Sequence, residues 1–292
     1  MSEHPSTPRL RLLVGVDLTE RSRSAFSRAV ELARASGGSL TLVHVTSDLL
    51  PPKLVDEHDS YARDLLGEHV LKAQAVGVSE VAQAIVYGRD YEQLIEQARK
   101  DESDVIVVGR HRPASLVQDM LGTTVDRVLR LGGIPVLVVQ HKAEHPYNSV
   151  LVAVDFSPAS RRALEYAVRW FPQARIVAVS AYGSPRRSLL TDNSAARRSV
   201  AETHRLALNG FLAEVGQALG PEHAAAVARI VPMVDHGWAE DVILRAVEAS
   251  KPDLLVIGTH ARAGIGHAVL GSVAEWVLVE APCDVLAVPP AP

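Results

Sequence analysis

Short runs of valine, leucine and isoleucine alternate along the chain with longer segments in which apolar positions recur every three to four residues. The short runs are continuous, which indicates strands buried on both faces of a sheet. The longer segments indicate amphipathic helices. The alternation is typical of an α/β fold, in which helices flank a doubly wound parallel sheet.

This order of elements occurs twice. The run Leu12-Leu-Val-Gly-Val-Asp17 returns as Val150-Leu-Val-Ala-Val-Asp155, and Gly88, Gly109 and Gly122 each recur 149 positions later, as Gly237, Gly258 and Gly271. A register kept over three glycines indicates a tandem repeat. Each repeat should hold five strands, with a helix after each of the first four, at 10–16, 39–45, 81–86, 104–109 and 135–139, and at 149–154, 175–181, 227–234, 253–258 and 284–288.

The repeat divides the chain into two predicted domains, residues 1–142 and 148–292. The polar segment 142–148, which contains a proline, is the expected linker. The second copy is longer between its first strand and Gly237, and we place the insertion in the Pro-, Ser- and Asn-containing segment 184–194.

Composition narrows the class of protein. An apolar fraction of 47%, a net charge of -4 and an absence of long basic runs favour an ordinary globular protein without nucleic-acid partners. No membrane span or signal pattern is evident, so we expect a cytoplasmic protein. The single Cys283 should pack in the core, and the histidines His111 and His260 do not form a zinc pattern.

Candidate chemistry concentrates after the fourth strand of the second copy, where a loop rich in glycine (Gly258, Gly264, Gly266, Gly271) leads into a helix at Ser272. Glycines let backbone N–H groups approach an anion, and a helix start adds unpaired donors and a positive dipole end. The loop is equally compatible with a simple strand-to-helix turn, and Ser272 with a helix cap. Asp155, at the end of the first strand, is a candidate ligand contact at the sheet's switch point. Asp155 or Ser157 is also expected to cap a helix that begins near Pro158, and the two roles can coexist.

These residues together resemble the universal stress protein family in its tandem form, which has a Rossmann-like fold of the adenine nucleotide alpha hydrolase type. The resemblance spans both copies. The ATP-binding pattern of that family, Gly-x-x-Gly-x9-Gly-Ser/Thr, maps onto Gly258, Ala261, Gly271 and Ser272, with Ala261 in place of the second glycine. The resemblance further implies that Asp155 lies near the nucleoside, that the backbone around Ala181 meets adenine, and that Val273 lines the phosphate site.

The first copy departs further from the pattern. Arg112 takes the place of the second glycine, between Gly109 and Gly122-Thr123, although Asp17 is present. Ser115 and Val117 replace Gly264 and Gly266, so this loop has lost backbone freedom. We favour an Arg112 side chain that fills a vacant pocket over one that meets an anion.

The sequence therefore predicts a stress-response protein that binds one ATP, with or without Mg²⁺, in its second domain and acts through binding without efficient catalysis. Two alternatives remain open: a slow ATPase or autophosphorylating switch, with Ser272 or Thr123 as acceptor, and a scaffold that holds a partner protein or an apolar ligand. The resemblance also implies that the two domains pair through their last strands, 136–139 and 284–288, and a homodimer of whole chains is favoured.

Overall fold

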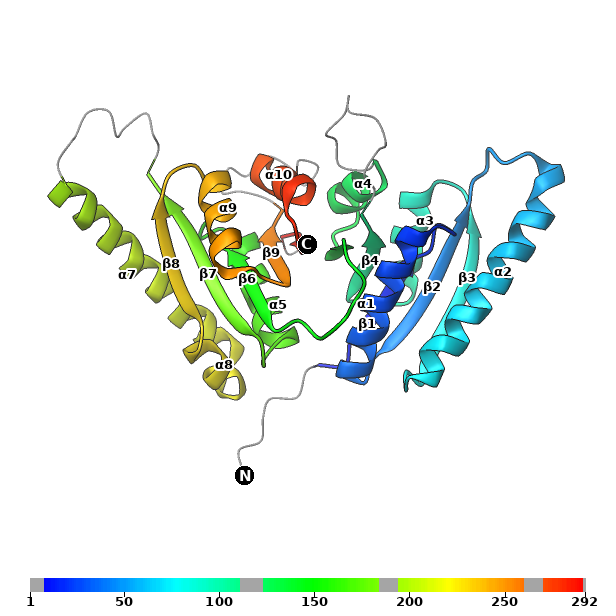
Figure 1. Ribbon diagram of the computed structural model, residues 1–292, viewed down its shortest axis with the longest axis horizontal. Helices are drawn as coiled ribbons and strands as arrows, with labels where there is room; N and C mark the ends of the chain where they lie inside the picture. The colour runs from blue at the N-terminus through cyan, green and yellow to red at the C-terminus, as the bar shows by residue number, and fades with distance from the viewer. Residues whose placement is uncertain (1–7, 111–122, 184–193, 260–269, 291–292) are drawn as a thin grey trace. The chain divides into compact units, whose positions relative to one another are not determined.

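The computed structural model describes residues 8–110, 123–183, 194–259 and 270–290. Contacts between Cα atoms divide the chain into two compact units, residues 8–146 and residues 147–292, each taken by itself below. Both are α/β units built from parallel strands and helices, as the sequence predicts (Figure 1).

In the first unit, strands and helices alternate from end to end. The elements are β1 (Arg11–Gly15), α1 (Glu20–Ser36), β2 (Ser39–Thr46), α2 (Pro52–Ala75), β3 (Glu80–Tyr87), α3 (Asp90–Lys100), β4 (Val105–Gly109), α4 (Thr123–Leu131) and β5 (Val136–Val139). The strand order is β3-β2-β1-β4-β5, and all the pairs are parallel. Right-handed crossovers place α1 and α2 on one face of this sheet, and α3 and α4, which pack together, on the other.

The second unit repeats this order with additions. Its elements are β6 (Ser149–Ala153), α5 (Pro158–Trp170), β7 (Arg175–Tyr182), α7 (Ser194–Leu219), a 3-10 turn η1 (Pro221–His223), α8 (Ala224–Ala228), β8 (Val231–His236), α9 (Ala239–Ser250), β9 (Leu254–Gly258), α10 (Ser272–Glu280) and β10 (Asp284–Val288). The strand order is β8-β7-β6-β9-β10, again parallel throughout. In each unit the order reverses between the first and fourth strands.

One predicted strand is wrong at its start. The apolar run predicted as a strand at 227–234 begins as α8, and β8 starts only at Val231. Three successive alanines, Ala224 to Ala226, favour helix, and period alone could not separate a short apolar helix from a strand. Because η1 and α8 have no counterpart between α2 and β3, part of the extra length of the second repeat lies after α7. Residues 184–193 of the expected insertion lie outside the described residues.

The central strands form the core of each unit. Leu13 of β1, Ile106 of β4, Leu151 of β6 and Leu255 of β9 are fully buried between helices on both faces. This burial explains why the strand sequences are continuously apolar. No helix in the described part of the chain is long and apolar enough to cross a membrane.

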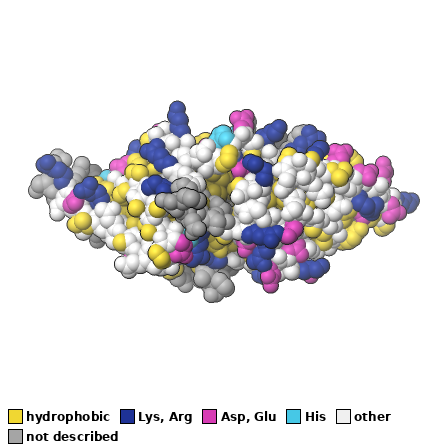
Figure 2. Space-filling model, turned by 90° about the horizontal axis from the view of Figure 1, so that it is seen from below, with side chains coloured by type: hydrophobic (Ala, Val, Ile, Leu, Met, Phe, Trp, Pro, Cys, Tyr) yellow, Lys and Arg dark blue, Asp and Glu magenta, His cyan; other side chains and the backbone are white. Residues whose placement is uncertain are grey.

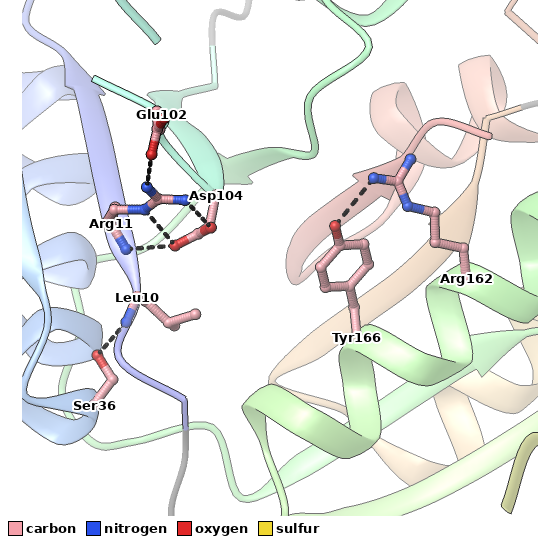
Figure 3. A network of polar contacts seen from close by, with 7 residues as sticks. All are labelled: Leu10, Arg11, Ser36, Glu102, Asp104, Arg162 and Tyr166. Atoms are coloured by element: carbon pink, nitrogen blue, oxygen red, sulfur yellow. Dashed lines mark hydrogen bonds and ion pairs between the residues drawn. The ribbon is translucent and has the colours of Figure 1, made fainter. Parts of the chain in front are cut away.

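A repeated aspartate ties the strands at their amino ends. Asp104, just before β4, accepts hydrogen bonds from the Arg11 backbone N–H at 2.8 Å and from the Arg11 guanidinium, which also reaches Glu102 (Figure 3). In the second unit Asp253 accepts the Ser149 backbone N–H at 2.9 Å. The aspartate shared by the two repeats therefore aligns the first and fourth strands, at the end opposite to the candidate site.

Candidate functional site

A cleft opens in each unit where the strand order reverses. In the second unit it lies at the carboxyl ends of β6, β7 and β9, between the first turns of α9 and α10. Its described lining is Ala153, Val154, Asp155, Ser160, Val179, Ala181, Ala239, Val242, Ile243, Ile257, Gly258, Thr259, Gly271, Ser272, Val273 and Ala274. A switch point between parallel strands is where doubly wound sheets bind ligands.

Six of the eight sequence-predicted site residues line this one cleft, although they lie far apart in the sequence. They are Asp155, Ala181, Gly258, Gly271, Ser272 and Val273. The other two, Ala261 and Gly264, lie outside the described residues, as do His111, Arg112 and His260.

Asp155 forms a turn and leaves the capping of α5 to another residue. Its Oδ1 accepts the backbone N–H of Ser157 at 2.9 Å, and Phe156 between them adopts a left-handed conformation with φ 65°. Ser157 is the N-cap of α5, because its Oγ accepts the Ser160 N–H at 3.1 Å. The alternative of Asp155 as a helix cap is therefore wrong, and its exposed carboxylate stands at the rim of the cleft.

The first repeat builds the same turn. Asp17 Oδ1 accepts the Thr19 backbone N–H at 3.0 Å and the Thr19 hydroxyl at 2.7 Å, and Leu18 has φ 60°. Two non-glycine residues in the left-handed region at matching positions show that the turn is a property of the repeat.

Gly258 is required for packing. A Cβ atom at this position would lie 2.7 Å from the backbone C of Ala159 and from the backbone N of Ser160, in the first turn of α5. Its φ is not in the left-handed region. Gly258 therefore lets α5 approach β9 closely, a role that the sequence did not indicate. Gly258 also lines the cleft, and its contact with a ligand stays a prediction.

The N-terminus of α10 is open towards the cleft. Gly271 is the N-cap with φ -66° and ψ 142°, and among the described residues no side chain caps the first-turn N–H groups. The Gly271 carbonyl accepts the N–H of Glu275 at 2.9 Å, and its N–H donates to the Thr259 carbonyl at 2.8 Å. The N–H groups of the first turn, from Ser272 to Ala274, belong to residues that line the cleft. A helix start of this kind stabilises a negative group.

The walls of the second cleft are apolar. Val154, Val179, Val242 and Ile243 contribute side chains, and Asp155 is the one carboxylate among the described lining residues. An apolar pocket with a few convergent polar groups is the usual form of a small-molecule site.

Sequence reasoning missed several lining residues. Thr259 is fully buried, and Ser160 donates its hydroxyl to the Ser157 carbonyl at 3.1 Å. Ser160 could have been found from the repeat, because Ser22 occupies the matching place and lines the first cleft. The α9 wall gave no motif, because small and branched apolar residues there look like any core helix.

The first unit has a cleft in the same place with different chemistry. Its lining includes Asp17, His44, Asp90 and Thr124. Burial lowers the pKa of the His44 imidazole, and its Nδ1 donates a hydrogen bond to the Val16 carbonyl at 2.7 Å. At neutral pH this ring is therefore uncharged, and the cleft carries two carboxylates without a cation among its described lining residues.

One face of the molecule carries mixed charge (Figure 2). Basic and acidic side chains are interspersed over the face in Figure 2, consistent with the net charge of -4. The described residues on this face do not form the one-sided positive patch that attracts nucleic acid.

Comparison with known proteins places the repeat in context. The family model described as "Universal stress protein family" matches residues 9–140 and again residues 146–289. Among curated relatives, universal stress protein E of Photorhabdus laumondii is 23% identical, with 96% of this chain and 94% of that protein covered. A universal stress protein of Mycobacterium tuberculosis is 26% identical, with 91% and 92% covered.

A solved structure resembles the chain over nearly its whole length. The crystal structure of a universal stress protein from Archaeoglobus fulgidus has a TM-score of 0.71 and 20% identity, and the match covers 96% of this chain and 98% of that one. At this identity the likeness establishes the fold.

Proposed function

The chain belongs to the universal stress protein family, a family with a role in the stress response, and we propose that its second domain binds an adenine nucleotide, ATP, and acts through that binding. The observation that carries the proposal is the N-terminus of α10, which no side chain of the described residues caps and whose first turn lines an apolar cleft at the switch point of the sheet. This arrangement offers an anion site next to a pocket for a flat apolar ring.

The residues present fit a nucleotide. The first-turn N–H groups of Ser272, Val273 and Ala274 can donate to phosphate oxygens, and the Ser272 hydroxyl is exposed beside them. The apolar walls suit adenine, and the exposed Asp155 carboxylate can accept hydrogen bonds from ribose hydroxyls. In this arrangement Mg²⁺ would accompany the phosphates.

The described part of this cleft has no placed base or nucleophile. Ser160 donates to a backbone carbonyl, and Ser272 lacks a neighbouring histidine or lysine among the lining residues. Efficient hydrolysis needs a base within hydrogen-bond reach of the attacking group. Binding without rapid turnover is therefore the function that the site supports best.

Two measurements on the intact chain test this proposal. Protein purified without added nucleotide should release an adenine nucleotide on denaturation, and added ATP should raise the melting temperature of the emptied protein. Phosphate release should stay near that of a heat-denatured control. Release far above the control would favour the slow ATPase, and a melting temperature unaffected by ATP would favour the scaffold.

A further inference from the structure

The clefts of the two domains differ in charge at the start of the helix that follows the third strand. Asp90 opens α3 and lines the first cleft, whereas Ala239 opens α9 and lines the second. The two positions are 149 residues apart and so correspond in the repeat. The first cleft therefore has one carboxylate more than the second.

Contacts from two helices fix the carboxylate of Asp90. Its Oδ1 accepts the N–H of Tyr91 in α3 at 2.8 Å, and its Oδ2 accepts the hydroxyl of Thr124 in the first turn of α4. The second domain has Val273 in place of Thr124, and valine cannot donate this bond. A negative charge thus stands beside the N-terminus of α4, where the helix dipole stabilises it.

The start of α4 corresponds to the start of α10, at which we place the phosphates in the second domain. A phosphate in the first cleft would meet the Asp90 carboxylate. Repulsion between like charges about 4 Å apart weakens binding about fivefold in water and about a thousandfold in a shielded cleft. The Asp90 carboxylate therefore puts a negative charge of the protein at the place where a bound phosphate would lie.

Apart from His44, which stands where the second domain has Ser180, the apolar walls of the first cleft match those of the second. Val43, Leu94 and Val108 stand where the second cleft has Val179, Ile243 and Ile257, and the Asp17 turn repeats that of Asp155. The part of the cleft that suits a base and a ribose is present in both domains.

We infer that the first-domain cleft is a site for an uncharged nucleoside, and that Asp90, held by Thr124, is the residue that excludes phosphate from it. The inference rests on the proposed function of the second domain for the orientation of the ligand. The inference assigns a nucleoside without phosphate to the first cleft and a nucleotide to the second.

Titration calorimetry of the intact chain with adenosine and with AMP tests this assignment. The wild-type chain should bind two adenosines and one AMP. Asp90→Asn keeps an acceptor for Thr124 and removes the charge, so the variant should fold, bind two AMP and still bind two adenosines.

Matched variants test whether the effect depends on the position of the carboxylate, and not only on the loss of one negative charge. Asp126→Asn removes a different carboxylate, from the first turn of α4, where Thr124 also lies. Asp126 pairs with Arg130 at 2.6 Å and does not line the cleft, so this variant should still bind one AMP. In the second domain Ala239→Asp should weaken AMP binding at least tenfold, whereas Ala239→Asn should leave it within about twofold.

Three results would overturn the inference: a single adenosine site that persists in all variants, two AMP sites in the wild-type chain, or no increase in the number of AMP sites from the wild-type chain to Asp90→Asn. Failure of the proposed function has a different signature. A wild-type chain that binds no AMP or ATP, but gains one AMP site on Asp90→Asn, would refute nucleotide binding by the second domain and leave the first-domain inference standing.

Discussion

Replacing Gly258 by alanine should destabilise the second domain. The added Cβ would lie 2.7 Å from two backbone atoms and 2.8 Å from the Cβ of Ala159, all in the first turn of α5. Backbone atoms cannot rotate away as a flexible side chain can, so α5 must move by several tenths of an ångström. Overpacking of this kind costs about 1–3 kcal/mol, which lowers the melting temperature of a domain of this size by about 3 to 9 °C.

Thermal unfolding followed by circular dichroism measures this change, and Gly210→Ala is the matched control. Gly210 lies inside α7, where a Cβ meets nothing within 4 Å. Alanine there should stabilise the helix by about 1 kcal/mol, so the two substitutions should shift the melting temperature in opposite directions. An unchanged melting temperature for Gly258→Ala, together with loss of ATP binding, would refute the packing explanation and return Gly258 to the ligand.

Three further predictions concern other groups. Burial lowers the pKa values of His44 and His69 below 6.5, so the unfolded chain takes up more protons than the folded chain, and stability should fall as pH decreases below about 6.5. His44→Asn, which can still donate to the Val16 carbonyl, should flatten this decline in melting temperature with pH. An unchanged slope in the variant would contradict the role given to His44. Burial raises the pKa of the Cys283 thiol to about 12, so iodoacetamide at pH 8 should label it only after unfolding; labelling of the folded chain at the rate of a free thiol would contradict this. Ser157→Ala removes the cap of α5 and should cost about 1 kcal/mol in urea unfolding, whereas a loss below a few tenths would show that the Ser160 N–H finds another acceptor.

The fold could be predicted because the central strands are continuous apolar runs and the glycines keep their register through both repeats. The failure at 227–234 has a physical cause, since the five residues of α8, Ala224–Ala228, are all apolar and have no polar positions to reveal a period. Tyr147 also escaped prediction: it stands in the expected linker, yet its side chain is buried and its hydroxyl donates to Asp284 at 2.6 Å. A single aromatic residue in a polar segment does not indicate its partner.

The candidate site was predictable where chemistry follows from position along a strand. Asp155 and Gly258 meet in one cleft because parallel strands bring their carboxyl ends to one edge, whereas Ala181 and Val273 were expected there only from the family resemblance. The role of Gly258 was not predictable, because it depends on which helix crosses β9. The sequence shows Asp90 at the place of Ala239, but its bond to Thr124 appears only when α3 and α4 are packed.

The stoichiometry of ATP binding tests the central claim most directly. The intact chain, titrated with ATP in a calorimeter, should bind one ATP in the cleft beside α10. Gly271→Val should abolish the heat, because a branched side chain would stand at the uncapped helix start, and Gly122→Val should leave it nearly unchanged. Two equivalent ATP sites, no ATP binding, or loss of binding through the Gly122 change alone would contradict the account.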